Sequence, residues 1–278
     1  MTLSDMRSIE ILGARVSYRI WGEKTGDALL CLHGNPTSSY LWRHVGEGLR
    51  DICTVIAPDL PGQGHSELGP RAGTWEDLEQ FVEDFAAALG LGPFSLALHD
   101  WGGLIGFRWL FDHPHREKNL RRLIISDTGF FPVGNDAWHS LAKIWRTDGE
   151  GEAWMDALTF DDFREVMRAA NASLSDEAVA EYWKTFSTKE RRYSKLALYR
   201  SGDFDKIRPY EGRLQALKCP ALIIWGENDI FIPAAAAHLF NQQIANSELH
   251  VLPDAGHFLW EDAPAATVRL VREFLLSY

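Results

Sequence analysis

The sequence is poor in cysteine, with three residues in 278: Cys31, Cys53 and Cys219. So small and odd a number argues against a disulfide scaffold and favours reduced thiols inside the cell. Long apolar runs are also missing, since no segment approaches the roughly 18 residues that a membrane-spanning helix requires. The stretch MTLSDMRSIEILG carries charges where a secretory leader needs its apolar core. These absences predict a globular, cytoplasmic protein that does not cross a membrane.

Positive charge is scarce relative to negative charge. The chain has 28 Lys and Arg residues against 39 Asp and Glu residues, a formal net charge of −11. Without a basic face to neutralise phosphate, neither nucleic acid nor an anionic membrane is an expected partner. Apolar residues make up 46% of the chain and aromatic residues 12%. A chain of this length and composition can bury a large core without a metal or a disulfide.

Short apolar runs alternate with amphipathic stretches along most of the chain. The runs predict strands at Val16–Trp21, Ala28–His33, Thr54–Asp59, Phe94–Asp100, Arg122–Asp127, Ala221–Gly226 and Glu248–Pro253. Several are apolar without a period of two, as is typical of parallel strands covered on both faces. Helical patterns lie between them, at Thr74–Leu89, Gly102–Phe111 and Ala263–Leu276. The alternation predicts a mostly parallel sheet flanked by helices, preceded by an antiparallel pair near residues 8–21.

The alternation breaks once, from about Val133 to Arg213. The segment has helical patterns without a β-run and contains four of the eleven tryptophans, Trp138, Trp145, Trp154 and Trp183. An all-helical insertion between two parallel strands is expected to lie over their carboxyl ends, where open α/β sheets bind ligands. We therefore predict a core domain, residues 1–132 and 214–278, and a helical cap, residues 133–213.

A candidate nucleophile lies where the strand FSLALHD runs into the helix WGGLIGF. Asp100 stands at the turn, and Gly102 and Gly103 supply the small residues that a nucleophile elbow needs. A carboxylate at this position can displace a leaving group from an sp³ carbon and form an alkyl ester with the enzyme. The same letters also fit an ordinary tight turn with a helix-capping Asp.

Two further candidates follow in chain order. Asp229 lies in the loop after the apolar run ALIIW, and His257 follows the next predicted strand in the motif GHFLWED. With Asp100 first, the order is nucleophile, acid, base, which is the order of triads in α/β-hydrolases. We therefore predict that His257 is the base and that Asp229 orients it.

A fourth motif, CLHGNPTSSYLWR, follows the predicted strand near residue 32. Gly34 and Pro36 favour a tight turn whose backbone N–H groups, with the amide of Trp101, can form an anion hole. The segments HGNPTSSYLWR, HDWGG and GHFLWED resemble the motifs of haloalkane dehalogenases of the α/β-hydrolase fold. The resemblance spans nearly the whole chain and is loosest in the cap. It implies a mostly parallel eight-stranded sheet with the helical cap inserted after the sixth strand.

The resemblance also implies a role for each matching residue. Asp100 attacks the halogen-bearing carbon, His257 activates the water that hydrolyses the ester, and Asp229 orients the imidazole. The side-chain N–H groups of Trp101 and Asn35 bind the departing halide.

Some family members take their acid from the end of the strand before the cap, which makes Asp127 an alternative to Asp229. The implied partners are a small apolar halogenated substrate and water, with no cofactor and no metal. A monomer or a homodimer is expected.

Two other functions stay open on the sequence. Epoxide hydrolases share the fold and the triad, but they protonate an alkoxide with two cap tyrosines, for which Tyr182 and Tyr199 are suitably placed. Two residues argue against this function. Leu98 stands where epoxide hydrolases usually carry glycine, and Asn35 stands where they more often carry an aromatic residue. The third possibility is a non-catalytic binding protein of the same fold, which halide release would distinguish from either enzyme.

Overall fold

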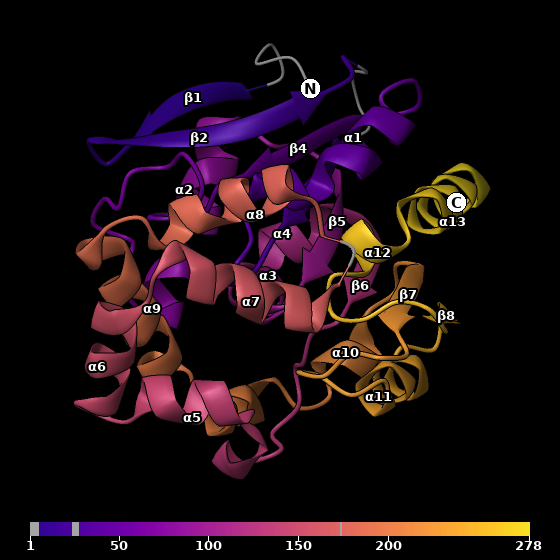
Figure 1. The fold of residues 1–278 in the computed structure, drawn as a ribbon. Helices are drawn as coiled ribbons and strands as arrows, with labels where there is room; N and C mark the ends of the chain where they lie inside the picture. Colours follow the sequence, from indigo (N-terminus) through magenta and orange to yellow (C-terminus); the bar gives the residue numbers. More distant parts are fainter. Residues whose placement is uncertain (1–5, 24–27, 173) are drawn as a thin grey trace.

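An eight-stranded sheet runs through the protein (Figure 1). The computed structural model describes residues 6–23, 28–172 and 174–278. The strands are β1 (Met6–Ile11), β2 (Ala14–Trp21), β3 (Ala28–Leu32), β4 (Thr54–Pro58), β5 (Phe94–His99), β6 (Leu120–Ser126), β7 (Ala221–Gly226) and β8 (Ser247–Leu252). Their order is β1-β2-β4-β3-β5-β6-β7-β8. The β1–β2 and β2–β4 pairs are antiparallel and the others are parallel, which confirms the predicted sheet.

Helices flank the sheet. Those attached to it are α1 (Arg43–Leu49), α2 (Trp75–Ala88), α3 (Trp101–Asp112), α4 (Pro114–Asn119), α10 (Arg213–Ala216), α11 (Ala235–Gln243), α12 (Leu259–Asp262) and α13 (Pro264–Ser277). Helix α1 packs against α13, and α3 packs against α2. The α3 ring of Phe107 stacks on Phe240 of α11, with ring centroids 5.6 Å apart. The strands β5 and β7 are buried along their whole length, and β6 is buried from Leu123 to Ser126, as their missing two-residue period predicts.

Five strands end one residue earlier than the apolar runs predict, before His33, Asp59, Asp100, Asp127 and Pro253. At Asp100 and Asp127 the reason is the backbone, because their φ angles of 51° and 41° leave the extended region. The last residue of each of these runs therefore lies in the loop that follows the strand. Since the carboxyl ends of parallel strands share one edge of the sheet, these loops bring their side chains near one another.

The chain between β6 and β7 contains helices, 3₁₀ turns and loops, and no strand occurs in its described residues. It contains α5 (Ser140–Arg146), α6 (Glu150–Ala157), α7 (Phe160–Ala170), α8 (Asp176–Trp183), α9 (Lys189–Ser201) and the short 3₁₀ turns Asn135–Ala137, Lys184–Phe186 and Phe204–Tyr210. In Figure 1, α7, α8 and α9 lie nearer to the viewer than α3 and β5. Helix α9 contacts α2, and α8 contacts the 3₁₀ turn Ser39–Trp42 of the loop after β3. The helical segment therefore rests on loops that leave the sheet at its carboxyl edge.

No helix in residues 6–23, 28–172 and 174–278 combines the length and apolar character needed to cross a membrane. Residues 1–5, which open the stretch examined for a secretory leader, lie outside the described part of the chain.

Candidate active site

Asp100 occupies a strained turn between β5 and α3. Its φ of 51° and ψ of −128° lie in a region that residues other than glycine rarely adopt. Although Asp100 directly precedes the helix, its side chain makes no capping hydrogen bond. Oδ1 instead accepts a hydrogen bond of 2.7 Å from the backbone N–H of Asn35. The strain therefore holds a carboxylate out of the helix and over the edge of the sheet, and the capping interpretation does not describe this turn.

Two glycines allow the elbow and the neighbouring loop to come this close. A Cβ atom on Gly34 would lie 2.1 Å from Oδ1 of Asp100, and one on Gly102 would lie 2.2 Å from the carbonyl oxygen of Leu32. Both distances are shorter than van der Waals contact. The loop HGN and the helix start DWGG therefore need glycine at these positions.

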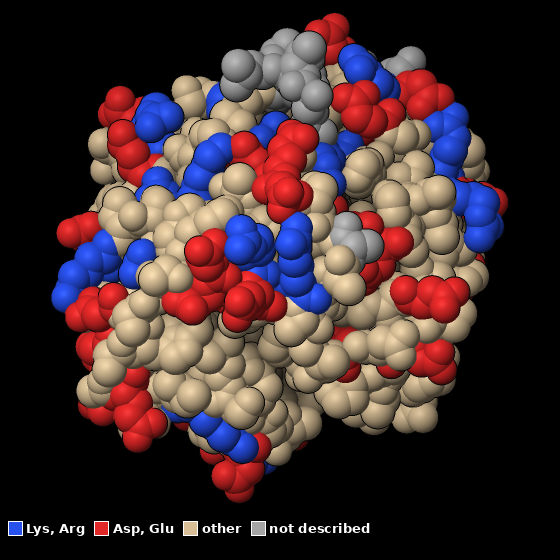
Figure 2. Space-filling view, viewed as in Figure 1, with Lys and Arg blue, Asp and Glu red and all other residues tan. Residues whose placement is uncertain are grey.

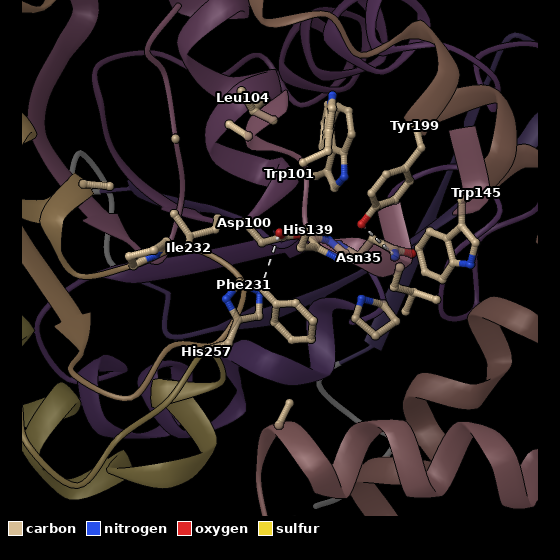
Figure 3. A pocket seen from close by; sticks show the side chains of 18 of the residues that line it. Asn35, Asp100, Trp101, Leu104, His139, Trp145, Tyr199, Phe231, Ile232 and His257 are labelled. Atoms are coloured by element: carbon tan, nitrogen blue, oxygen red, sulfur yellow. Dashed lines mark hydrogen bonds and ion pairs between the residues drawn. The ribbon is translucent and has the colours of Figure 1, made fainter. Parts of the chain in front are cut away.

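His257 lies between the two predicted acidic residues. Figure 3 shows its contact with Asp100 as a dashed line. Its Nδ1 is 2.8 Å from Oδ2 of Asp229, and its Nε2 is 3.6 Å from Oδ2 of Asp100. The other Asp229 oxygen accepts hydrogen bonds from the backbone N–H groups of Phe231 and Ile232, at 2.7 and 2.9 Å. A fixed acid thus orients the imidazole, which can reach the nucleophile with its other nitrogen.

The charges of these three groups support one another. Burial alone would lower the pKa of His257, but the negative charges of Asp229 and Asp100 outweigh burial and raise it well above its usual value. Burial alone would likewise raise the pKa of Asp100, but the hydrogen bond and charge of His257 lower it. Each group therefore favours the charged form of the other.

Asp127, the alternative acid, directly follows β6 and is fully buried. Its Oδ1 accepts a 3.0 Å hydrogen bond from the backbone N–H of Gly226, whereas Nδ1 of His257 is bonded to Asp229. Burial, followed by the charge of Asp229, raises the pKa of Asp127 well above its usual value. Its backbone carbonyl accepts from the N–H of Asp100, at 3.2 Å. Asp127 thus links the nucleophile turn to β7, while Asp229 holds the orienting position.

Asn35, Trp101 and Tyr199 form one corner of the site. The Asn35 side-chain N–H points to the phenol oxygen of Tyr199, at 3.4 Å, and the Trp101 and Tyr199 rings meet edge to face with centroids 5.2 Å apart. All three side chains are buried. Burial and the nearby charge of Asp100 raise the pKa of Tyr199, so the phenol keeps its proton. The corner offers neutral donors next to the nucleophile.

Tyr182 does not belong to this corner, which corrects its prediction as a site residue. Its ring on α8 is fully buried, and its hydroxyl donates to Glu261 at 2.5 Å. Glu261 also forms a buried ion pair with Arg43, whose Nη2 is 2.6 Å from Oε2. Tyr182 is not among the residues that line the cavity above Asp100. A buried carboxylate needs hydrogen-bond donors for the lone pairs that its cationic partner leaves free. The Tyr182 hydroxyl is such a donor for Glu261, so the phenol points into the core.

The cavity above Asp100 has a volume of about 280 Å³ and is mostly apolar. Apart from tryptophan indoles, its polar side chains are Asn35, Asp100, His139, Tyr199 and His257. Helices α5, α7 and α11 each contribute apolar residues to the lining. Figure 2 shows a hollow on this face between those helices, surrounded mainly by uncharged residues. The cavity therefore suits a small apolar molecule with one polar end.

Most lining residues were not predicted from the sequence, and Trp138, His139 and Phe231 are those that contact the predicted ones through their rings. Trp138 stacks on Trp101 with ring centroids 5.8 Å apart, but its indole N–H donates to Asn135. Phe231 lies between two imidazoles, since its ring centroid is 5.0 Å from that of His139 and 5.0 Å from that of His257. Its position two residues after Asp229 was the one available signal.

In residues 6–23, 28–172 and 174–278, no three His, Cys, Asp or Glu side chains gather into a group that could hold a metal ion.

Comparison with known proteins shows the family of the chain. The pattern of the α/β hydrolase fold family matches residues 27–264. A cis-3-alkyl-4-alkyloxetan-2-one decarboxylase of Xanthomonas campestris pv. campestris is 32% identical over alignments covering 95% of this chain and 93% of its own. A haloalkane dehalogenase of Bradyrhizobium diazoefficiens is 28% identical, with coverage of 96% and 93%. The crystal structure of haloalkane dehalogenase DbeA from Bradyrhizobium elkani has a TM-score of 0.87 and 27% identity, covering 98% of this chain and 97% of that one.

The chain belongs to the α/β-hydrolase fold family. Within that family it is a haloalkane dehalogenase-like hydrolase, with epoxide hydrolases among its relatives.

Proposed function

We propose that the protein is a hydrolytic dehalogenase that converts haloalkanes into an alcohol and halide through a covalent alkyl ester of Asp100. One observation carries the proposal. A strained, ionised carboxylate faces the His257–Asp229 pair on one side and the neutral donors of Asn35 and Trp101 on the other. A nucleophile, a base with its orienting acid, and uncharged N–H donors are the groups that this reaction needs.

The first step is displacement of halide. An oxygen of Asp100 forms a bond to the sp³ carbon while the carbon–halogen bond breaks. The electron pair of the carbon–halogen bond leaves with the halide. Because Oδ1 accepts a hydrogen bond from the backbone N–H of Asn35, Oδ2 is the attacking atom. A halide needs no proton, so the indole N–H of Trp101 and the amide N–H of Asn35 suffice to stabilise it in a dry cavity.

The second step is hydrolysis of the ester. His257 takes a proton from a water molecule, and the water oxygen attacks Cγ of Asp100. Negative charge then develops on Oδ1, where the backbone N–H of Asn35 already donates at 2.7 Å. Collapse breaks the bond between Cγ and the alkyl oxygen, His257 returns the proton to the departing alkoxide, and Asp100 is a carboxylate again.

Residues 133–213 are proposed to be the cap of this enzyme, over a core domain of residues 1–132 and 214–278. The apolar residues that α5 and α7 place in the cavity support this division. A small halogenated substrate and water are the proposed partners, for a cytoplasmic monomer or homodimer. The described cysteines are free thiols, in keeping with a reducing compartment.

A substrate panel tests the function. Purified protein is incubated with bromo- and chloroalkanes and, separately, with simple epoxides, and halide and diol are measured. We expect halide from the alkyl bromides and no enzymatic diol. Diol formation without halide release would instead establish an epoxide hydrolase, and turnover of neither class would favour a binding protein. The position of Tyr182 argues against the epoxide function. Its hydroxyl donates to Glu261 outside the cavity, so Tyr199 lacks the second tyrosine with which it would protonate an alkoxide.

A second candidate function is the opening of a four-membered lactone. The observation that favours it is the 32% identity to an oxetan-2-one decarboxylase over 95% of this chain. Attack of Asp100 on the sp³ ring carbon would break the ring C–O bond and expel a carboxylate, which needs donors but no proton. Loss of CO₂ would then form the alkene while Asp100 leaves as a carboxylate, so the sequence consumes no water.

The two functions differ in their need for the base. A cis-3,4-dialkyl oxetan-2-one is incubated with the wild type and with His257→Phe, and CO₂ and alkene are measured. If the protein is a decarboxylase, both proteins should produce alkene, because no water is activated. Absence of enzymatic alkene from the wild type would remove this candidate and leave the dehalogenase untouched.

The Trp101→Phe variant should lose most of the stabilisation of the departing halide. Phenylalanine removes the indole N–H and nearly keeps the shape of a side chain that is 2% exposed. Loss of one preorganised donor costs about 2.7–4 kcal/mol, or roughly 10²–10³-fold in rate. Asn35→Ala should act in the same direction with a smaller effect. Single-turnover halide release measures both, and a wild-type rate in Trp101→Phe would exclude the indole from the leaving-group site.

The two chemical steps should respond differently to pH. Because His257 lowers the pKa of Asp100, halide release in a single turnover should be independent of pH from about pH 5 upward. Ester formation removes the charge of Asp100, one of the two charges that raise the pKa of His257. Hydrolysis should therefore rise with pH as His257 loses its proton and then level off. Rapid-mixing measurements separate the steps, and parallel acid limbs for both would contradict the assignment.

A further inference from the structure

His139 is a polar side chain of the cavity wall that the proposed mechanism does not use. It precedes α5, and its Nδ1 accepts a 3.2 Å hydrogen bond from the backbone N–H of Ala142. A ring nitrogen that accepts a hydrogen bond carries no proton, so the neutral imidazole has its proton on Nε2. Burial lowers the pKa of His139, which favours this neutral form. The helix cap thus sets the tautomer and leaves an N–H donor on the other edge of the ring.

The ring of His139 lies close to the reacting groups. Its centroid is 5.0 Å from that of Phe231 and 6.4 Å from that of Tyr199, and both rings line the cavity. Asp100 is the foremost of the charged groups that act on it, followed by His257 and Asp229. No acceptor for Nε2–H occurs among residues 6–23, 28–172 and 174–278. This donor therefore belongs to a residue of the cavity wall and has no partner among the described residues.

An N–H donor without a protein partner acts on specificity when the wall around it is largely apolar. Asn35 and Trp101 face the leaving group, and Asp100 and His257 carry the chemistry, whereas the other lining side chains apart from Tyr199 are largely apolar. In such a cavity one positioned polar group orients a ligand and discriminates against analogues that lack its partner.

We propose that Nε2–H of His139 binds an oxygen atom of the substrate near the reacting carbon. The preferred substrates then carry an ether, hydroxyl or carbonyl oxygen in addition to the halogen. This inference rests on the proposed dehalogenase function and specifies its substrate class.

Matched pairs of substrates test the proposal. Each pair exchanges one CH₂ for an ether oxygen: 1-bromobutane with 1-bromo-2-methoxyethane, and 1-bromopentane with 1-bromo-3-methoxypropane. The ratio of kcat/KM for ether over alkane is measured in the wild type, His139→Phe and His139→Ser. Phenylalanine keeps the ring, and serine keeps a helix-capping side chain, so the two variants share only the loss of the N–H donor. We expect the ratio to fall about tenfold in both variants for at least one pair.

Three outcomes would overturn the proposal or its basis. An unchanged ratio for both pairs, or an equal loss for ether and alkane, means that His139 only caps α5. A fall of the ratio in one variant but not the other likewise excludes the N–H donor. Absence of halide from all four bromides contradicts the dehalogenase function itself. In that case the binding of 2-methoxyethanol and 1-butanol, followed by tryptophan fluorescence, still decides on His139, because only a donor makes the ratio of the two dissociation constants depend on this residue.

Discussion

The His257→Phe variant should release about one halide per active site and then stop, with steady turnover reduced by roughly 10⁴-fold or more. Displacement depends on Asp100 and the leaving-group donors, whereas hydrolysis depends on the base. Phenylalanine fits the buried place of the imidazole, whose neighbours include Phe231 and Phe258. The trapped ester should appear as a protein whose mass has increased by the alkyl group, on the peptide that contains Asp100.

The matched control is Asp100→Asn, which removes the nucleophile and keeps the size of the side chain. This variant should show neither the halide burst nor the mass increase. Steady turnover in His257→Phe would exclude His257 as the base, and a burst in Asp100→Asn would exclude Asp100 as the attacking group.

Asp229→Asn should slow hydrolysis of the alkyl-enzyme by roughly 10³–10⁴-fold, an effect of the size known for the orienting acid of other triads. The 2.8 Å contact with Nδ1 of His257 would lose its charge, and the asparagine amide can present a donor where an acceptor is needed. The pKa of His257 would fall with it, because the charge of Asp229 is the foremost cause that raises it.

Asp127→Asn is the matched variant at the other candidate acid, and it should stay within about tenfold of the wild type. Burial and the charge of Asp229 raise the pKa of Asp127 and so favour its neutral form, which a neutral amide resembles. The amide oxygen can still accept from the N–H of Gly226. Single-turnover hydrolysis measures both variants, and equal losses in the two would show that Asp127 shares the role given to Asp229.

The elbow and the order of its partners could be predicted because they are local in the sequence. Gly34 and Gly102 are needed where two backbones meet, and Asp100 stands directly after an apolar run, so each leaves a mark in a few neighbouring letters. The distances from His257 to Asp229 and Asp100 follow from the parallel sheet, which collects the loops after β5, β7 and β8 at one edge.

The helical segment was less predictable because packing decides which side chains its helices direct inward. Tyr182 and Tyr199 look alike in the sequence, yet they have different partners. The Tyr182 hydroxyl donates to Glu261 of the buried Arg43–Glu261 pair, whereas the Tyr199 hydroxyl accepts from the Asn35 side chain. His139 lies between a loop and a helix. Its ring packs in the cavity wall against Phe231, which is far along the chain. Such choices arise from contacts between distant residues, which periodicity and spacing do not contain.

The most direct test of the covalent mechanism is one turnover in ¹⁸O-labelled water with enzyme in excess over an alkyl bromide. If Asp100 attacks carbon, the alcohol takes its oxygen from the unlabelled carboxylate, and the label enters Asp100 when water attacks Cγ. The covalent mechanism therefore predicts unlabelled alcohol and one ¹⁸O atom in the peptide that contains Asp100. Labelled alcohol in that first turnover, with an unlabelled Asp100 peptide, would mean direct attack by water and would contradict it.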